Sequence, residues 1–250
     1  MRYFLEIAYN GKNYHGWQNQ PDAISVQEKL EEALSTLLRT KIETVGAGRT
    51  DAGVHAKQLF VHFDYDGSVA TDNLIFRLNS FLPKAIAIYD FFPVKADAHA
   101  RFDALSRTYE YVLSIGKDPF TQDFSYQIQQ QPDVEAMQEA AEILLQYNDF
   151  QCFSKSKTDV KTYLCKIYNA YWIKKEKQLI FTITADRFLR NMVRAVVGTL
   201  LDVGFHKIQS ADMHRIIDGK NRTNAGKSVP ANGLYLTKVT YPDTIKITHG

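Results

Sequence analysis

Residues 46–55 read GAGRTDAGVH, a stretch in which three glycines and two alanines surround Arg49, Asp51 and His55. The chain has 250 residues and only 13 glycines, so three glycines within this stretch are a local concentration. Glycine is used where the backbone turns sharply or comes very close to another group. The stretch therefore predicts a tight loop that sets a charged pair, Arg49 and Asp51, among very small side chains.

The residues on either side of this loop predict one half of an α+β fold. Ser25 and Glu28 form a capping-box pattern at the start of a helix at 26–38, whose apolar residues recur at helical spacing. After the loop, alternating apolar residues predict a strand at 58–63. The other elements expected in this half are a strand at 3–9, a helix at 72–81 with Thr71 as its cap, and a strand at 86–91.

The rest of the chain repeats this plan with different loops. Two alternating runs, 166–175 and 178–185, flank Glu176 and Lys177 and predict a hairpin. A long apolar helix at 188–203 is expected to end at Gly204, because glycine is common at the C-cap of helices. The other expected elements are a strand at 107–114, helices at 134–147 and 213–217, and a closing strand at 234–239.

This repetition predicts two domains, 1–104 and 105–250. Each would be an α/β half with a mostly antiparallel sheet, and the first would carry the loop at 46–55. Clefts shared by two domains are common places for ligand sites. We therefore expect a functional site where the two halves meet.

The composition is typical of a globular protein, with 45% hydrophobic and 23% charged residues. No run approaches the roughly 20 apolar residues of a membrane span. The first residues, MRYFLEIAYNG, alternate like a strand and carry Arg2 and Glu6, unlike a secretion signal. We expect a cytoplasmic protein. Cys152 and Cys165 have no metal-site or CxxC spacing, which predicts two reduced, partly buried thiols.

Charge is distributed unevenly along the chain. Lys and Arg number 13 against 16 Asp and Glu in residues 1–125, and 17 against 12 in residues 126–250. Ten basic and three acidic residues lie between Lys155 and Arg194. This run is a candidate phosphate-binding surface, and the alternative is a lysine-rich face that contacts only solvent.

Two phosphate-binding interpretations of the loop fail on its chemistry. A dinucleotide fingerprint, G-x-G-x-x-G, would place Asp51 where its last glycine belongs, and a carboxylate there repels pyrophosphate. A phosphate loop of the Walker type needs Lys and Ser or Thr after its last glycine, but Gly53 is followed by Val54 and His55.

Three further interpretations remain open from the residues alone. A metal site could recruit several side chains, although no recognised ligand spacing links them: Asp51, His55, His62, Asp97 and His99. Alternatively, His55 is a hydrogen-bonded loop histidine, and Arg49 and Asp51 are a simple ion pair.

The last interpretation makes Asp51 a nucleophile or general base. In an extended segment Arg49 and Asp51 share one face, so the cation could keep the carboxylate ionised. The small residues would then leave room for a bulky substrate beside the backbone.

Six motifs in the same order along the chain resemble those of the tRNA pseudouridine synthase A family. They are YNGKNYHGWQNQ (9–20), SVQEKLEEAL (25–34), GAGRTDAGVHA (46–56), ARFDALSRTYEYVL (100–113), FLRNMVRAVVGTLLDVG (188–204) and PANGLYLTKVTYP (230–242). The resemblance implies a pseudouridine synthase fold, with two ferredoxin-like α/β halves meeting at a basic central cleft. It also implies a homodimer that isomerises uridines 38, 39 and 40 of the tRNA anticodon stem-loop without a cofactor or a metal.

The resemblance also implies roles for individual residues. Asp51 would be the catalytic nucleophile, Tyr109 would contact the substrate base, Arg49 would hold the flipped-out nucleotide, and Arg194 would pair with Asp51. In the strand at 107–114, Tyr111 is expected to pack in the core.

The basic residues fit this scheme at two places. Arg187, Arg190 and Arg194 are spaced by three and four, so on one helix they would form a cationic stripe. We expect Arg187 and Arg190 to face phosphate or solvent. The lysines from Lys155 to Lys177 would hold the RNA backbone.

The chain departs from the family pattern at a few positions: Asn148, Arg190, His206 and the run Ser228-Val229-Pro230. None of these is Asp51, Tyr109 or Arg194, so the departures concern substrate range and RNA docking more than the type of reaction. The main alternative function is a non-catalytic RNA-binding module, which leaves the carboxylate of Asp51 unexplained. A metal-dependent hydrolase is a weaker alternative.

Overall fold

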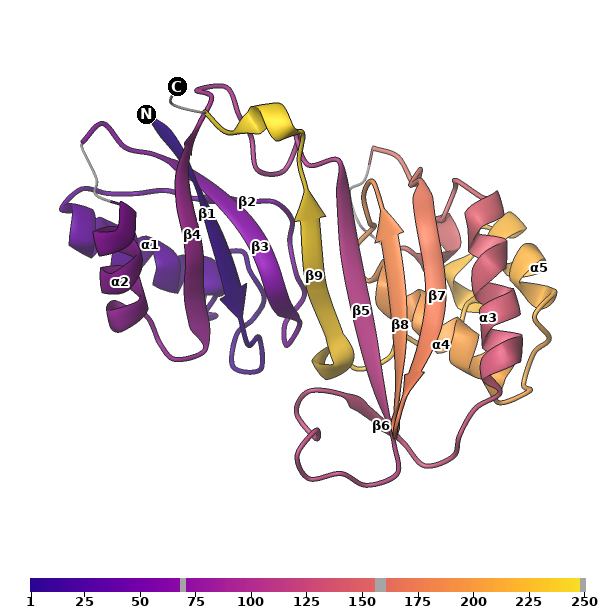
Figure 1. Ribbon diagram of the computed structural model, residues 1–250. Coiled ribbons are helices and arrows are strands. Elements are labelled where there is room, and N and C mark those ends of the chain that lie inside the picture. The colour runs from indigo at the N-terminus through magenta and orange to yellow at the C-terminus, as the bar shows by residue number, and fades with distance from the viewer. Residues whose placement is uncertain (68–70, 156–160, 248–250) are drawn as a thin grey trace. The chain divides into compact units, whose positions relative to one another are not determined.

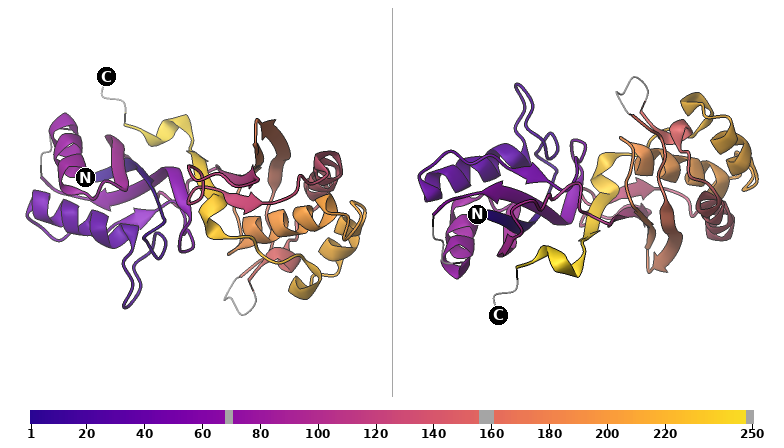
Figure 2. Two further views of the ribbon diagram at one scale, coloured as in Figure 1. Left: turned by 90° about the horizontal axis from the view of Figure 1, so that it is seen from below. Right: turned by 90° about the horizontal axis from the view of Figure 1, so that it is seen from above.

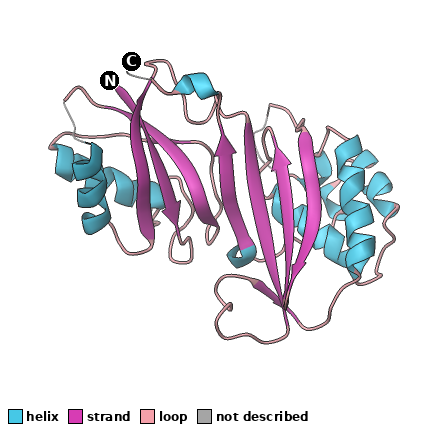
Figure 3. Cartoon of the chain, in the orientation of Figure 1, coloured by secondary structure: helices cyan, strands magenta, loops and turns pink. Residues whose placement is uncertain are grey.

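A computed structural model describes residues 1–67, 71–155 and 161–247 of the chain. These residues form five α-helices and nine strands (Figures 1 and 3). The α+β class is as predicted, whereas the short strands Val45–Gly46 and Tyr126–Ile128 were not expected. The chain divides into two compact units: Met1–Leu105 together with the C-terminal segment from Tyr235, and Ser106–Leu234. The closing strand therefore belongs with the first unit, whereas the expected division into 1–104 and 105–250 left it in the second half.

The first unit contains a sheet of strand order β4-β1-β3-β9, with β2 paired to the end of β3. Strand β1 is antiparallel to both β3 and β4, and β9 is parallel to β3. The elements of this unit are β1 (Arg2–Tyr9), α1 (Val26–Leu38), β2 (Val45–Gly46), β3 (His55–Asp64), α2 (Thr71–Phe81), β4 (Ile86–Val94) and β9 (Leu234–Thr240), followed by a 3₁₀ turn (Asp243–Ile245).

Helix α1 begins where the sequence predicts. The Ser25 side chain accepts a hydrogen bond from the backbone N–H of Glu28, and the Glu28 side chain accepts one from the Ser25 N–H. This capping box satisfies backbone donors that have no partner inside the helix. Val26, Leu30 and Leu34 are fully buried on the inner face of α1. Figures 1 and 2 show α1 and α2 next to each other beside the strands of this unit.

The second unit contains three antiparallel strands in the order β5-β8-β7, with β6 parallel to β5. Helix α3 packs against α4, β7 and α5. The helices and strands are β5 (Ser106–Ile115), β6 (Tyr126–Ile128), α3 (Val134–Ile143), β7 (Ile167–Lys175), β8 (Gln178–Ala185), α4 (Met192–Gly204) and α5 (Asp212–Asp218). Single 3₁₀ turns occur at Leu144–Gln146, Gln151–Phe153, Arg222–Asn224 and Ala231–Gly233.

The predicted hairpin is confirmed, with Glu176 in a left-handed conformation at φ 49° in the two-residue turn. The pairing of the three long strands aligns Tyr111, Phe181 and Trp172 across one face of the sheet. Tyr111 is fully buried, as predicted for a core residue, and its hydroxyl donates a 2.7 Å hydrogen bond to the Pro230 carbonyl. Burial also raises the pKa of Tyr111 well above its ordinary value.

The predicted start of the long helix is wrong, whereas its predicted end at Gly204 is confirmed. Helix α4 starts at Met192 because Asn191 has a left-handed backbone with φ 67°, which a continuing helix does not allow. Arg187 and Arg190 therefore precede the helix, and the predicted cationic stripe along one helix does not form. At the other end Gly204 is still helical, and the left-handed residue is His206 at φ 55°.

Gly204 is needed for packing and not for a left-handed cap. A Cβ there would lie 2.7 Å from the Met137 sulfur and 2.8 Å from the Pro132 ring, so glycine lets α3 and its preceding residues approach α4 closely. Helix α3 itself ends at Ile143 and continues as a 3₁₀ turn, shorter than the expected 134–147.

Within 1–67, 71–155 and 161–247, none of the helices combines the length and the apolar character that a bilayer crossing requires.

Candidate active site

The loop that carries Asp51 connects β2 to β3 and is covered by residues 10–20, the loop after β1. The Thr50 hydroxyl oxygen accepts a 3.1 Å hydrogen bond from the backbone N–H of Trp17. The same oxygen lies 2.9 Å from the hydroxyl of Tyr9. Two segments distant in sequence are thus tied together at the residue next to Asp51, which fixes the backbone that presents the carboxylate.

Glycine is required at different positions of this loop for different structural reasons. A Cβ on Gly46 would lie 2.6 Å from the indole nitrogen of Trp17, which is 3% exposed, so Gly46 makes room for that ring. Gly53 has a left-handed backbone at φ 78°. Gly48 has no neighbour within 4 Å of a Cβ built on it. The space that was expected for a bulky substrate is therefore present beside Gly48. Beside Gly46 the ring of Trp17 fills it.

The opening loop also needs glycine to approach the loop of Asp51. A Cβ on Gly11 would overlap the Val54 carbonyl, and one on Gly16 would overlap the Thr50 carbonyl. Gly16 in addition has φ 91°. The motifs at 9–20 and 46–56 therefore form one structural unit in which backbone packs directly on backbone.

Both histidines of β3 are buried and have structural contacts. His55 accepts a 3.1 Å hydrogen bond from the N–H of Gly11 and stacks on Tyr235, in accord with a hydrogen-bonded histidine at the end of the loop. His62 accepts a 3.1 Å bond from the N–H of Ala100. Burial, assisted by the charges of Arg2 and His99, lowers the pKa of His62 to about 4. Among the described residues no group of three or more His, Cys, Asp or Glu side chains is arranged to hold a metal ion.

Asp51 is partly exposed, and Arg49 is exposed. The backbone carbonyl of Asp51 accepts a 3.2 Å hydrogen bond from the N–H of Val54, which closes a turn directly after the carboxylate. The Asp51 side chain thus projects from a turn at the surface and not from a buried strand. The interaction of Arg49 with Asp51 stays a prediction.

The two other predicted site residues belong to the second unit. Tyr109, on β5, is partly exposed, and its ring meets that of Phe188 edge to face with centroids 5.1 Å apart. Arg194 lies in the first turn of α4, and its Nε donates a 2.7 Å hydrogen bond to the Val229 carbonyl. The pairing of Arg194 with Asp51 would join the two units and stays a prediction.

The basic run is exposed where the structure describes it. It comprises Lys155, Lys161, Lys166, Lys174, Lys175 and Lys177, whereas Lys157 lies outside the described residues. Arg190 is also exposed, and its carbonyl accepts a hydrogen bond from the N–H of Lys155. These side chains are accessible to a polyanion.

Both cysteines are free thiols and buried. Burial raises the pKa of Cys152 and of Cys165 to about 12, so neither thiol is ionised near neutral pH. A thiolate nucleophile is therefore not available from either residue.

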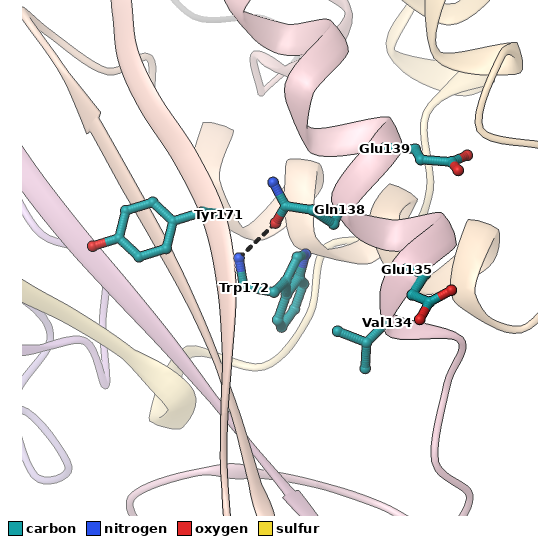
Figure 4. Close-up of a pocket in the computed structure, with 6 residues that line it drawn as sticks. All are labelled: Val134, Glu135, Gln138, Glu139, Tyr171 and Trp172. Carbon is teal, nitrogen blue, oxygen red and sulfur yellow. Dashed lines mark hydrogen bonds between the residues drawn. The ribbon is translucent and has the colours of Figure 1, made fainter.

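A cavity of about 460 Å³ lies between α3 and β7 and contains none of the predicted site residues (Figure 4). The Trp172 backbone N–H donates a 2.9 Å hydrogen bond to the Gln138 side chain at its edge. Two glutamates, Glu135 and Glu139, make the cavity unsuited to a phosphate. Its six lining residues are Val134, Glu135, Gln138, Glu139, Tyr171 and Trp172.

Sequence reasoning missed the residues that hold the site. Thr50 lies inside the quoted motif, but its role depends on Trp17, which is 33 residues away. Val229 belongs to a run that departs from the family pattern, and its carbonyl accepts the hydrogen bond that orients Arg194. No local pattern signals either contact, because each joins a motif to a distant segment.

Comparison with known proteins places this α+β chain among RNA-modifying isomerases. The family described as tRNA pseudouridine synthase matches residues 7–103 and 140–242. A tRNA pseudouridine synthase A of Bacteroides fragilis is 51% identical over 246 residues, covering 98% of each chain. One from Porphyromonas gingivalis is 51% identical over 248 residues, again covering 98% of each chain, and one from Caldicellulosiruptor bescii is 38% identical over 239 residues, covering 95% of this chain and 98% of the relative.

The chain belongs to the tRNA pseudouridine synthase family, which confirms the resemblance seen in its motifs. As a member of this family it is an isomerase. Its fold class is that of the family.

Proposed function

We propose that this enzyme converts uridine to pseudouridine at positions 38, 39 and 40 of the tRNA anticodon stem-loop, with Asp51 as the nucleophile. The observation that carries the proposal is the loop at 46–55, in which a partly exposed carboxylate stands on a backbone fixed by a second loop. The family membership of the whole chain supports the reaction type.

The reaction needs a carboxylate and no redox partner. The N1–C1′ glycosidic bond breaks, the uracil turns while it stays bound, and C5 bonds to C1′ as the C5 proton leaves for N1 or a base. Nothing is oxidised or reduced, and no water is consumed. Asp51 can act by attack on C1′ or by removing a neighbouring sugar proton, and both routes require its ionised form. A nearby cation favours that form, which is the role we assign to Arg194.

Access to C1′ requires the target nucleotide to leave its stack, at a cost of a few kcal/mol. An aromatic ring on the enzyme can replace part of the lost stacking, about 1–3 kcal/mol per base. We assign this role to Tyr109, whose hydroxyl can also take part in moving the C5 proton. Arg49 would hold the phosphate or sugar of the flipped nucleotide.

The exposed lysines between Lys155 and Lys177 would contact the tRNA backbone, which fixes position without reading sequence. Binding carried by such contacts weakens as salt rises. We further propose that the enzyme is a homodimer and that it acts in the cytoplasm. Light scattering on the purified protein can check the oligomeric state.

The test supplies tRNA tritiated at C5 of uridine and measures tritium release. Wild type should release tritium, and Asp51→Asn should reduce the rate by about 10³-fold or more while tRNA binding persists, because a neutral amide cannot replace the nucleophile. Asp66→Asn is the matched control, since Asp66 is an exposed carboxylate paired only with the chain's amino terminus among the ion pairs seen in the described residues.

Other results would change the proposal in defined ways. Equal release by wild type and Asp51→Asn would remove Asp51 from the mechanism. Binding without release by wild type would favour the RNA-binding module. Stem-loops with a single uridine at position 38, 39 or 40 test the positions separately from the chemistry.

A further inference from the structure

Val229, from a distant segment of the chain, holds Arg194 through two hydrogen bonds. Its Nε donates a 2.7 Å hydrogen bond to the Val229 carbonyl, and the Val229 N–H donates a 3.2 Å bond to the Arg194 carbonyl. Because the guanidinium is planar, a fixed Nε also fixes the directions of its two terminal nitrogens. The direction in which this cation points therefore depends on where Val229 lies.

Val229 belongs to a segment, residues 222–230, that crosses α4 in close contact. A Cβ on Gly198 would overlap the Lys227 carbonyl, so the segment touches the helix backbone at that point. The Gly226 N–H donates a 2.8 Å hydrogen bond to the Thr199 hydroxyl. These contacts anchor the middle of the segment on α4, one turn beyond Arg194.

Ser228 ties the same segment to the start of α4. Its hydroxyl oxygen accepts a 2.9 Å hydrogen bond from Nη2 of Arg222 and a 2.5 Å bond from the side-chain amide of Asn191. Arg222 also donates through Nη1 to the Gly226 carbonyl at 3.0 Å. Asn191 is the left-handed residue directly before α4. The Ser228 hydroxyl therefore links Asn191, the residue before α4, to the segment that contains Val229.

We propose that Ser228, with Asn191 and Arg222 as its donors, is a positioning residue that aims the guanidinium of Arg194 for catalysis. The inference rests on the proposed function, because it takes Arg194 as the partner of Asp51. It adds three residues to the site, and none of them contacts the substrate in this scheme.

A positioning role has consequences that a purely structural role lacks. Loss of the Ser228 hydroxyl frees Asn191 and Arg222 from their shared acceptor, so Val229 and the guanidinium can shift together. A displaced cation lowers kcat, because Arg194 no longer lies where the proposed chemistry needs it, whereas the groups that would hold the tRNA are unchanged. A loss confined to kcat, with KM for tRNA unchanged, therefore distinguishes positioning from general damage to the fold.

The experiment compares wild type with Ser228→Ala in the full-length enzyme. We expect kcat for tritium release near neutral pH to fall about 10-fold, in line with the cost of small misplacements in active sites, with KM for tRNA unchanged. Ser228→Thr, which keeps the hydroxyl, should restore most of the rate.

Ser210→Ala is the matched control. Ser210 lies in the same unit, outside the 222–230 segment, and donates a 3.1 Å hydrogen bond to Glu139. The Ser210→Ala substitution should leave kcat unchanged. A fall in kcat of similar size in Ser210→Ala would show that loss of any serine hydroxyl has this effect and would overturn the proposal.

A second measurement applies if Ser228→Ala folds poorly. Arg194→Ala leaves the Val229 carbonyl without its Nε donor, so added guanidinium ion should restore part of the activity. The concentration for half-maximal rescue should be several-fold higher in Arg194→Ala/Arg222→Ala than in Arg194→Ala alone, because the Nη2 donor to Ser228 is removed. Equal rescue in both backgrounds contradicts the proposal.

The failure of this inference is distinct from failure of the proposed function. If wild type releases tritium, Asp51→Asn does not, and Ser228→Ala keeps the wild-type kcat, the positioning role is wrong and the function stands. If wild type releases none, the proposed function itself fails.

Discussion

The loop that presents Asp51 and the start of the helix that presents Arg194 are each held by a second segment of the same unit, but by different means. Around Asp51, glycines let one backbone lie directly on another, and the main side-chain tie is the hydroxyl of Thr50. Around Arg194, the ties are side chains with charged or amide donors that converge on Ser228.

This difference separates two kinds of mutational effect. A backbone contact made possible by glycine has no alternative arrangement, so a larger residue there must displace a segment and costs stability. A contact made by side chains can re-form in another rotamer, so its loss shifts geometry more than stability. The Asp51 region should therefore respond mainly in unfolding free energy, and the Arg194 region mainly in kcat.

The largest effect on stability should come from a glycine that faces backbone. Gly11→Ala should lower the free energy of unfolding by about 3 kcal/mol, because its Cβ would overlap the Val54 carbonyl. Gly46→Ala should cost about 1–3 kcal/mol, since the ring of Trp17 can move. Gly48→Ala should cost about 0.5 kcal/mol or less, because open space surrounds that position.

Urea denaturation of the three variants measures this order. Gly48→Ala is the internal control, since it adds the same methyl group to the same kind of residue. If Gly48→Ala is as destabilising as Gly11→Ala, backbone crowding does not govern the stability of the Asp51 region. A normal stability of Gly48→Ala with slow tritium release would support the view that the open space receives substrate.

The next effect concerns the Thr50 hydroxyl. Thr50→Val should lower the unfolding free energy by about 1–3 kcal/mol, because the N–H of Trp17 loses its acceptor inside the protein. Thr50→Ser keeps the oxygen and should retain most of the stability. Thermal denaturation of the pair provides the check, and equal midpoints would mean that the methyl group of Thr50, not its hydroxyl, holds the two loops together.

The smallest effect is a pH dependence confined to the first unit. The pKa of buried His62 is about 4 when folded and 6.5 ordinarily, so below about pH 6.5 the unfolded chain takes up a proton that the folded chain does not. Stability should therefore fall as pH drops, by about 1 kcal/mol between about pH 7 and pH 5.5.

His62→Gln removes the titrating group and should flatten this part of the pH–stability curve. His214→Gln, at a partly exposed residue of the second unit, is the matched control and should leave the curve as in wild type. Hydrogen exchange at about pH 5.5 should accelerate in β2 and β3 before it does in β7 and β8. The opposite order would show that acid weakens the second unit first.

Local elements were predictable because local patterns determine them. The capping box of α1 and the turn between β7 and β8 lie within a few residues of the structure they specify, and both are confirmed. The predicted start of α4 was wrong because a distant segment determines it. Asn191 is held in its left-handed conformation next to Ser228, 37 residues further on, and no helix propensity contains that information.

For the candidate site, the sequence supplies the residues of interest, and their roles stay predictions. The identity of Asp51, Tyr109, Arg49 and Arg194 as candidates came from motifs, and the family that the motifs resemble is confirmed. The contacts that hold these residues were not predictable, because Thr50 and Val229 each act on a partner from a different segment. The position of β9 in the first unit is another long-range result that the repeated plan of the sequence did not indicate.

The pairing of β9 with β3 has a consequence for the order of events during synthesis. Tyr235 and Leu236 align with His55 and Ala56, the first residues after the loop of Asp51. Residues 106–234 can fold as soon as they leave the ribosome, whereas the first unit lacks its last strand until almost the whole chain has been made. A nascent chain therefore carries the loop of Asp51 next to an incomplete sheet until translation is nearly finished, and a stop codon near the 3′ end of the message would disturb a candidate site encoded near its beginning.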